Sequence, residues 1–408
     1  MWALHFGFGV VAPIVVALLT VIVKQRTPID AQAKPSFVPL KVPEIELPSP
    51  EIVFEGKVVA GESFAEGPDG WMYVSGGDGV IWRFKEDLTA EPVARTGEPS
   101  VHCGRVKAME PFCGRPLGLA FASDGALLIC DAYKGLMKLD LDDESQPVGK
   151  DGLARPVVLA SEASDGSPIR FCNSVLPVET ETEGGGIEEV FFFTDTSEKW
   201  QRNEVLYEIL EGAPKGRILQ FRPSTGRAEI LKSDLKFPNG LLKSPSANES
   251  EDALLMVELN SYSVWKFFHR GPRRGSWERV MEQMPCVPDN LSPGRSGPTA
   301  TFFAGCAYKR KSAERIMAPT YVRQALAALF PMSAIEYVSK TFFDNRATVL
   351  EVREDGSPIA MYRAPKEAGG FIFCAEAVVW NGFVWLGTWF APQSMARWRL
   401  EDFRFVDI

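Results

Sequence analysis

Histidine is scarce in this chain, which has only His5, His102 and His269 among 408 residues. No two of them are spaced as a pair of metal ligands, and no Cys-x-x-Cys motif is present, which argues against a zinc site. The chain also lacks the Gly-x-Ser-x-Gly motif, and three histidines are too few for a serine–histidine arrangement. Neither a Gly-x-Gly-x-x-Gly motif nor a phosphate-binding loop occurs. Zinc chemistry, a serine nucleophile and nucleotide binding are therefore not expected.

Positive charge is also in deficit. Lys and Arg number 44 against 53 Asp and Glu, which gives a formal net charge of −9. The short basic run RGPRR at 270–274 is typical of a solvated turn, so we expect no nucleic-acid partner. The rest of the composition, 45% hydrophobic and 24% charged, is that of a globular protein. A chain of 408 residues is long enough for one large closed architecture or for two to three ordinary domains.

Charged residues are absent from the N-terminal run 2–23, which is rich in Val, Leu, Ala, Phe and Gly. As a helix rising ~1.5 Å per residue, it would reach about 30 Å and cross a bilayer core. Pro13 would bend such a helix without preventing the crossing. A cleaved signal peptide is the alternative, because Ala-Gln-Ala at 31–33 resembles a cleavage site. However, a polar stretch separates that site from the apolar run, so we predict an uncleaved transmembrane anchor over residues 1–26.

The orientation of this anchor rests on conflicting signals. Lys24 and Arg26 follow the span and no basic residue precedes it, which by the positive-inside rule would place the body in the cytosol. A glycosylation sequon at Asn248 and a disulfide candidate favour the other side. We predict a type II, single-pass membrane protein whose body is lumenal or extracellular, in the endoplasmic reticulum or at the plasma membrane.

Seven cysteines are present, an odd number. Cys103 and Cys113 bracket a short polar loop and are the best candidates for a disulfide. Four others lie in or beside apolar strand-like runs and are interpreted as small buried hydrophobic residues: Cys130, Cys172, Cys306 and Cys374. Cys286 lies in a turn, and the sequence assigns it no role.

Strand-like repeats dominate the chain after a proline-rich segment at 27–52, which is interpreted as an extended stalk. Each repeat combines a turn bearing Gly with Asp, Asn or Pro, a β-rich run, and a second strand ending in an aromatic residue or Leu. The clearest units span Gly67–Phe84, Ala122–Asp140 and Val379–Leu400. Six such units can be counted, which predicts an all-β fold, a six-bladed β-propeller over residues 53–408.

One segment breaks the strand pattern. Residues 311–339 have helical spacing in their middle, with Val322, Ala325, Leu326 and Leu329 on one face. We predict a helical insertion in the fifth blade that lies across one face of the ring. It could be a lid over a functional site. It could equally pack over a blade edge or rest on a membrane surface.

Oxygen-bearing side chains recur at matching points of different repeats, at Glu62, Asn173, Asn239 and Asp289. Each opens a short segment that ends in an apolar, β-rich run. If the repeats close into a ring, these four side chains point into one central opening. Their carboxylate and amide oxygens suit a hard cation such as calcium (Ca2+). Taken singly, Asn239 and Asp289 are typical of turns, so it is their recurrence in register that predicts a metal site.

Long stretches of the chain resemble the strictosidine synthase-like family. They span Cys113–Asp140, Phe191–Phe221, Leu235–Ser244 and Met284–Pro293. The resemblance covers nearly everything after the proline-rich segment. It implies a six-bladed propeller behind an N-terminal membrane anchor, related more distantly to paraoxonases and gluconolactonases.

In those wider relatives a calcium ion lies in the central channel. The resemblance implies that its ligands here are a first-blade glutamate, two asparagines and an Asp–Asn pair, namely Glu62, Asn173, Asn239, Asp289 and Asn290. Many metal-binding relatives have an aspartate where this chain has Ser174, and its loss should weaken the affinity for calcium. The paired histidines of paraoxonases have no evident counterpart.

Any catalysis would then rest on the cation. Calcium can polarise an ester or lactone carbonyl and stabilise the oxyanion that forms when water attacks. Asp289 or Glu62 could orient or deprotonate that water. We therefore expect a membrane-anchored, calcium-dependent hydrolase whose partner is a small-molecule aryl ester or lactone. The alternative is a non-catalytic binding or scaffolding propeller with structural calcium.

Two further residues have open roles. His102 could approach the channel mouth as a base, or be a loop histidine beside a disulfide. Glu376 lies near the place where plant strictosidine synthases carry a catalytic glutamate. A channel-lining or structural glutamate is the alternative, with a pKa that shifts if the side chain is buried.

Overall fold

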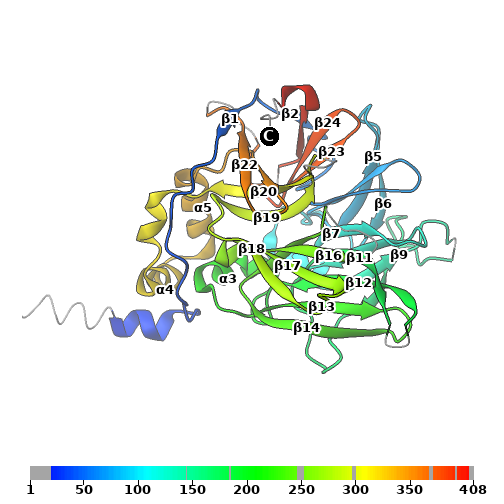
Figure 1. Ribbon diagram of the computed structural model, residues 1–408, viewed down its shortest axis with the longest axis horizontal. Helices are drawn as coiled ribbons and strands as arrows, with labels where there is room; N and C mark the ends of the chain where they lie inside the picture. Colours follow the sequence, from blue (N-terminus) through cyan, green and yellow to red (C-terminus); the bar gives the residue numbers. More distant parts are fainter. Residues whose placement is uncertain are drawn as a thin grey trace, which may run out of the picture.

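The strands form six antiparallel sheets that follow one another along the chain (Figure 1). The structure is a computed structural model that describes residues 20–143, 145–182, 185–245, 252–295, 300–366, 371–390 and 393–403. Blades one to three comprise β3 (Phe64–Glu66), β4 (Met72–Ser75), β5 (Val80–Phe84), β6 (Ala90–Arg95); β7 (Pro116–Phe121), β8 (Leu127–Asp131), β9 (Gly135–Leu139), β10 (Val157–Ala160); and β11 (Cys172–Glu181), β12 (Ile187–Asp195), β13 (Gly216–Arg222), β14 (Arg227–Leu235). Blades four to six comprise β15 (Pro238–Lys243), β16 (Asp252–Glu258), β17 (Ser263–Arg270), β18 (Trp277–Met281); β19 (Cys286–Pro293), β20 (Thr301–Lys309), β21 (Thr348–Arg353), β22 (Pro358–Arg363); and β23 (Cys374–Trp380), β24 (Phe383–Thr388), β25 (Met395–Arg399). The predicted six-bladed β-propeller is confirmed.

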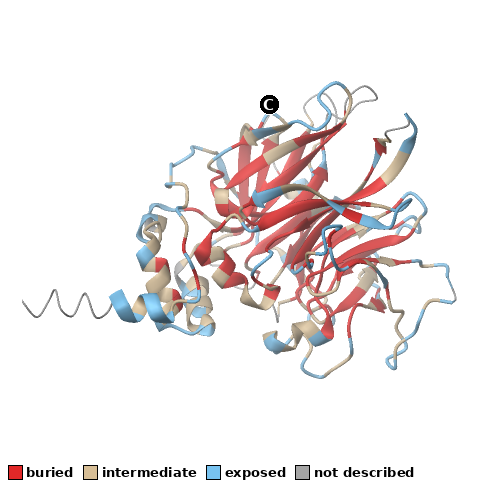
Figure 2. Cartoon of the chain, turned by 90° about the horizontal axis from the view of Figure 1, so that it is seen from below, coloured by how far each residue is buried: buried red, intermediate tan, exposed pale blue. Residues whose placement is uncertain are grey.

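Side chains that alternate along each strand bind neighbouring blades together. In β12, Phe191 and Phe193 pack into the core shared with blade two, whereas Val190 and Phe192 pack into the core shared with blade four. The strand is therefore apolar on both faces, which explains its unbroken apolar sequence. Truncating a buried phenylalanine of this kind costs ~3–5 kcal/mol. Figure 2 shows the buried strands at the centre, with exposed residues on the loops and helices around them.

The N-terminal segment closes the ring and is not a free stalk. Strand β2 (Glu51–Val53) pairs with β25 as the outer strand of blade six, and β1 (Glu44–Glu46) pairs in parallel with β22 of blade five. The segment is extended, as expected, but it buries Ile29 and Leu47 against the propeller, each only 3% exposed. Burial of these apolar side chains holds it on the body. Covering the sheet edges in this way also protects them from pairing with other chains.

The predicted membrane anchor lies mostly outside the described residues. The described chain begins with a helix at 20–26, which lies at the same end of the molecule as α4 (Figure 1). Within the described range, no helix is both long and apolar enough to cross a membrane. The sequon at Asn248 also lies outside the described residues.

Helices cover one end of the propeller. Between β12 and β13 lies α3 (Val205–Glu211), and between β20 and β21 lie α4 (Thr320–Leu329) and α5 (Met332–Phe342). Pro319 and Pro331 directly precede α4 and α5, where a missing N–H and a fixed φ suit the start of a helix. Arg323 of α4 donates hydrogen bonds to the carbonyl oxygens of Leu210, Glu211 and Gln32. This one side chain therefore ties α4 to the C-terminal end of α3 and to the N-terminal segment.

Three disulfides stabilise the body. The predicted bond between Cys103 and Cys113 is confirmed, with Cα atoms 5.6 Å apart. Two further bonds are Cys130–Cys172 and Cys286–Cys306, so the interpretation of Cys130, Cys172 and Cys306 as small buried hydrophobic residues was wrong, and Cys286, which had no assigned role, has a partner. Cys130 of β8 and Cys172 of β11 belong to neighbouring blades, whereas Cys286 of β19 and Cys306 of β20 lie on paired strands of blade five. Cys374 is buried and free, as expected.

Inner strands of neighbouring blades approach so closely that two positions require glycine. A Cβ on Gly118 would lie 2.6 Å from both the carbonyl oxygen of Asn173 and the Cα of Ser174. A Cβ on Gly240 would lie 2.6 Å from the Cα of Asn290. These backbone atoms cannot move aside without shifting a whole strand, so the two glycines set the spacing of blades two to five.

We predict that Gly118→Ala lowers the free energy of unfolding by about 1–3 kcal/mol, because the added methyl group overpacks the strand contact. Denaturant unfolding of the purified protein measures this change. Gly186→Ala is the matched control, because the nearest atom to its added Cβ is a flexible side-chain oxygen at 3.3 Å. Equal stability of both variants would contradict the packing constraint.

Candidate functional site

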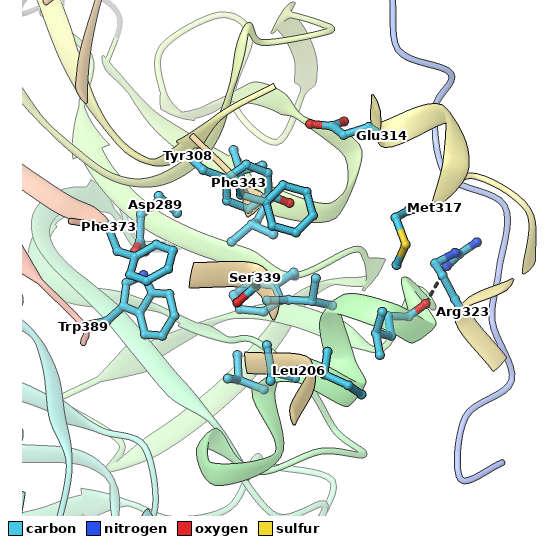
Figure 3. Close-up of a pocket in the computed structure, with 18 of the residues that line it drawn as sticks. Leu206, Asp289, Tyr308, Glu314, Met317, Arg323, Ser339, Phe343, Phe373 and Trp389 are labelled. Carbon is cyan, nitrogen blue, oxygen red and sulfur yellow. Dashed lines mark hydrogen bonds between the residues drawn. The ribbon is translucent and has the colours of Figure 1, made fainter. Parts of the chain in front are cut away.

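A cavity of about 480 Å³ extends from the centre of the propeller toward the helices (Figure 3). Its walls are largely apolar and include Leu206, Phe237, Phe330, Phe343, Phe373 and Trp389. Asp289 lies beside Phe373 and Trp389 at one end of the view, while Glu314, Met317 and Arg323 lie at the other end (Figure 3). Helices α4 and α5 contribute to the walls through Leu326 and Ile335. The insertion thus covers the site, as a lid would.

A β-bulge stands at the start of the inner strand in five blades. In each, two residues of the inner strand face one residue of the next strand, as between Cys172 and Val175 opposite Phe193–Asp195. Equivalent shifts occur in β7, β15, β19 and β23. In blade one, Glu62 and Ser63 hold the corresponding place before β3. The N–H of Glu62 donates to the carbonyl oxygen of Ser75, and the N–H of Ser75 donates to the carbonyl oxygen of Ser63. A bulge of this kind re-aims side chains at a functional site.

The two residues of each bulge have different environments. First-position residues line the cavity in five of the six blades, namely Glu62, Leu117, Asn173, Asn239 and Asp289. The second-position residues are Ser63, Gly118, Ser174, Gly240, Asn290 and Glu376, and none of them lines the cavity. The structure therefore brings together four of the five predicted metal ligands. Asn290 is buried in β19 next to Asp289 but does not reach the cavity wall.

Two amide oxygens in the cavity wall are buried without a partner. Asn239 Nδ2 donates to Asp289 Oδ1 at 2.6 Å, and Asn173 Nδ2 donates to Thr196 Oγ1 at 3.0 Å. These bonds use the amide nitrogens and leave Oδ1 of Asn173 and Oδ1 of Asn239 with no hydrogen bond among the described residues. An unsatisfied buried acceptor costs about 1–3 kcal/mol. Two such oxygens at one place indicate a bound cation or an ordered water.

The charges at this end of the cavity are unequal. Burial, followed by the nearby charge of Glu62, raises the pKa of Asp289 well above its ordinary value. Glu62 Oε2 accepts a hydrogen bond of 2.6 Å from Arg115 Nη2, in an ion pair that is almost completely buried. The positive charge of Arg115 thus compensates the carboxylate of Glu62, and the carboxylate of Asp289 is left uncompensated. A hard cation would neutralise that second carboxylate without any change of protonation.

The donor set fits a hard oxygen-seeking cation better than a transition metal. It consists of two carboxylates and two amide oxygens, the ligand types that calcium takes. Among the described residues, no three His, Cys, Asp or Glu side chains form a group that could hold a metal ion. Any ion at this site therefore depends on the amide oxygens of Asn173 and Asn239.

Second-position residues join neighbouring blades. Ser174 Oγ accepts a hydrogen bond of 3.0 Å from the backbone N–H of Leu241 in the next inner strand. Glu376 Oε2 accepts one of 3.0 Å from the N–H of Phe64 and so connects blade six to blade one. Burial raises the pKa of Glu376 to about 8. These contacts support the structural alternative for Glu376.

Histidine does not contribute to the cavity. His102 is exposed on the disulfide loop, and His269 is buried beside Asp252. The described residues that line the cavity include no histidine. The structure therefore gives no support to His102 as a base at this site.

Three basic residues of the site were not singled out by the sequence patterns. Arg202 lines the cavity and Arg115 contacts it through Glu62, and the carbonyl oxygen of Trp389 accepts a hydrogen bond from each arginine. Lys34 enters the cavity from the N-terminal segment, where its Nζ donates to Asn260 Oδ1 at 2.7 Å. Burial, followed by the charge of Arg323, lowers the pKa of Lys34 to about 7. Arg115 lies in a stretch that carries the family resemblance, whereas no motif or repeat in the sequence indicated a role for Lys34.

Comparisons with known proteins agree with this architecture. The strictosidine synthase family model matches residues 186–272. The adipocyte plasma membrane-associated protein of Bos taurus is 30% identical over 392 residues, covering 94% of this chain and 88% of that protein. A strictosidine synthase-like protein of Arabidopsis thaliana is 29% identical over 350 residues, covering 82% of each chain. A gluconolactonase structure from Xanthomonas campestris superposes with a TM-score of 0.50 at 12% identity, covering 90% of this chain and 97% of that one, which shows a shared fold alone.

We predict that Lys34 makes stability depend on pH. Its pKa of about 7 lies below the 10.5 of an ordinary lysine, so between these values the unfolded chain binds more protons than the folded chain. Stability then rises with pH across this window, by at most about 1.4 kcal/mol per pH unit. In Lys34→Met this rise should disappear, as measured by denaturant unfolding at pH 7, 8 and 9. Lys41→Met, at an exposed position of the same segment, should keep the wild-type slope. Parallel slopes for all three proteins would contradict a neutral Lys34.

Proposed function

The chain belongs to the strictosidine synthase-like family, which includes the adipocyte plasma membrane-associated proteins, and from this premise we propose that it is a membrane-attached, calcium-dependent hydrolase of small apolar esters or lactones. One observation carries the proposal. The unsatisfied oxygens of Asn173 and Asn239 meet Asp289 at the polar end of an otherwise apolar cavity. A hydrolytic site needs this combination of a charged centre and a dry pocket for the substrate.

Glu62, Asn173, Asn239 and Asp289 would hold the calcium ion, with Asn290 supporting Asp289 from the next position of β19. A bound calcium ion supplies the positive charge that polarises a substrate carbonyl. Asp289 would orient an attacking water and accept its proton. Asn239 fixes the orientation of Asp289 through its hydrogen bond of 2.6 Å. Arg115 holds Glu62 in place through their ion pair, whereas Asp289 has Asn239 as its partner.

The rest of the cavity suits an apolar substrate. Its volume of about 480 Å³ lies within the ~300–1,000 Å³ of small-molecule sites. Phe373 and Trp389 lie beside Asp289 and offer aromatic faces to an aryl or acyl group (Figure 3). Helices α4 and α5 cover the cavity and exclude water from it. Aryl esters and lactones with apolar substituents are therefore the proposed substrates.

A second candidate function is a non-catalytic binding or scaffolding propeller in which calcium is structural. The observation that favours it is the absence of histidine from the described cavity lining. The direct ion pair of Glu62 with Arg115 also supports it, because it occupies one carboxylate. In this alternative the cation would join the inner strands and stabilise the folded state.

Membrane attachment is proposed for the end that carries the helices. The uncharged run 2–23 leads into the helix at 20–26, which lies at the same end as α4 (Figure 1). Large apolar side chains are exposed on and beside the helices there, including Tyr321 and Tyr337 at 69% each. Such side chains suit contact with lipid. The three disulfides favour an oxidising compartment, so the body would be lumenal or extracellular, with Asn248 as a glycan acceptor.

We predict that Asp289→Asn lowers kcat/KM for an aryl ester by at least about a hundredfold, because the proton acceptor is lost. Asn239→Ala should lower both this activity and the calcium-induced rise in melting temperature, because an amide ligand is lost. The assay is hydrolysis of a panel of aryl esters and lactones by the full-length protein, with calcium and with chelator. Asp87→Asn, which changes an exposed acid on a loop, is the control and should behave as wild type.

The same experiment separates the two candidate functions. A wild-type protein whose melting temperature rises with calcium but that turns over no ester or lactone would support the structural alternative. Unchanged hydrolysis in both Asp289→Asn and Asn239→Ala would rule out the proposed catalytic site.

A further inference from the structure

A second cavity, of about 210 Å³, lies next to the first. Arg202 and Trp389 line both cavities, so they form the wall between them. The remaining walls come from the loop that the Cys103–Cys113 disulfide closes, from the start of β7 and from α5. Of its lining residues, the hydrolysis proposed above uses Arg115, as the partner of Glu62.

Basic side chains dominate the lining of the second cavity. They are Arg105, Lys107, Arg115 and Arg202, and the acids that line it are Glu110 and Glu336. The protein as a whole carries a net charge of −9, so this local excess of positive charge is opposite in sign to the net charge of the chain. Four cations against two acids leave the lining with net positive charge, which attracts anions.

The acids do not satisfy all the hydrogen-bond donors of this cavity. Arg202 Nη1 lies 3.4 Å from Glu110, and Lys107 Nζ lies 3.7 Å from Glu336, so both ion pairs are long. Arg115 Nε is buried with no hydrogen bond among the described residues. Arg105 is exposed, and it forms no ion pair with any other residue that the structure describes. Donors that lack acceptors in a basic cavity point to a missing anion.

Glycine at position 77 gives Arg115 its place in the cavity wall. Gly77 and Gly104 line the cavity and contribute no side chain to it. A Cβ on Gly77 would lie 2.0 Å from Arg115 Nη1, so the guanidinium group fits only against a glycine. Burial first, and then the nearby charge of Arg202, lowers the pKa of Lys107. An anion between these groups would relieve the repulsion.

We propose that the second cavity binds a small anion through a carboxylate or phosphate group. Arginine presents a planar fork of N–H donors that matches both groups, and charge-assisted bonds to them are the strong ones. Arg105 and Lys107 receive the anion at the loop, while Arg115 and Arg202 face it from the interior. Because Arg202 and Trp389 also line the first cavity, an anion bound here lies beside the central site.

Calorimetric titration of the full-length protein with inorganic phosphate and, separately, with benzoate tests this proposal at constant ionic strength. We expect saturable binding of at least one of the two anions. Binding should be at least tenfold weaker in the double variant Arg105→Gln/Lys107→Gln, because two of the four cations are lost. Preference for benzoate identifies a carboxylate site, and preference for phosphate identifies a phosphate site.

The matched control is Lys366→Gln/Arg399→Gln, which removes the same charge from exposed positions elsewhere. It should bind as wild type does. If the double variant of the loop melts at a lower temperature than wild type, Arg105→Gln alone replaces it, with an expected weakening of at least threefold. No saturable binding of either anion by the wild type, or equal affinity in wild type and loop variants, would overturn the proposal. The titration needs no turnover, so its outcome is independent of the hydrolase proposal.

Discussion

The two-residue bulge at the start of the inner strand in five blades is the constraint on which the rest of the structure depends. Its first residue lines the central cavity in four of these blades, and second residues such as Gly118 and Ser174 pack against the next blade. Gly118 and Gly240 show how tight this second contact is, since a methyl group on either would meet backbone atoms at 2.6 Å. The packing of the ring and the position of the site oxygens are therefore set by the same residues. A change that loosens the blades also displaces the site.

Electrostatics divide the centre of the molecule into two regions. Asp289 and the amide oxygens of Asn173 and Asn239 form an electron-rich end of the apolar cavity, where a cation would be stabilised. Arg115 and Arg202 lie directly beside it and form the border of a basic cavity. The ion pair of Arg115 with Glu62 joins the two regions. A cation on one side and an anion on the other would each reduce the uncompensated charge that burial makes costly.

Local and periodic features could be predicted from the sequence, and contacts set by closure of the ring could not. Strand alternation and repeated turns predicted six blades, and matching positions in the repeats predicted that Glu62, Asn173, Asn239 and Asp289 meet. The family resemblance added Asn290 to this group, and the sequence alone does not reveal that a bulge gives Asp289 and Asn290 different environments. The Cys130–Cys172 disulfide, which joins two blades, and the entry of Lys34 into the cavity depend on long-range packing. A proline-rich composition predicted extension correctly but could not show that the segment lies on the body.

The central claim is that four side chains, one from each of four blades, hold a hard cation at the end of the cavity. The most direct test is a crystal structure of the protein grown with a lanthanide in place of calcium, examined for anomalous scattering. The predicted result is one strong peak about 2.3–2.6 Å from Oδ1 of Asn173 and Oδ1 of Asn239, with Asp289 and Glu62 in the same coordination sphere. Density for water alone beside these two oxygens, with no anomalous peak, would contradict the claim.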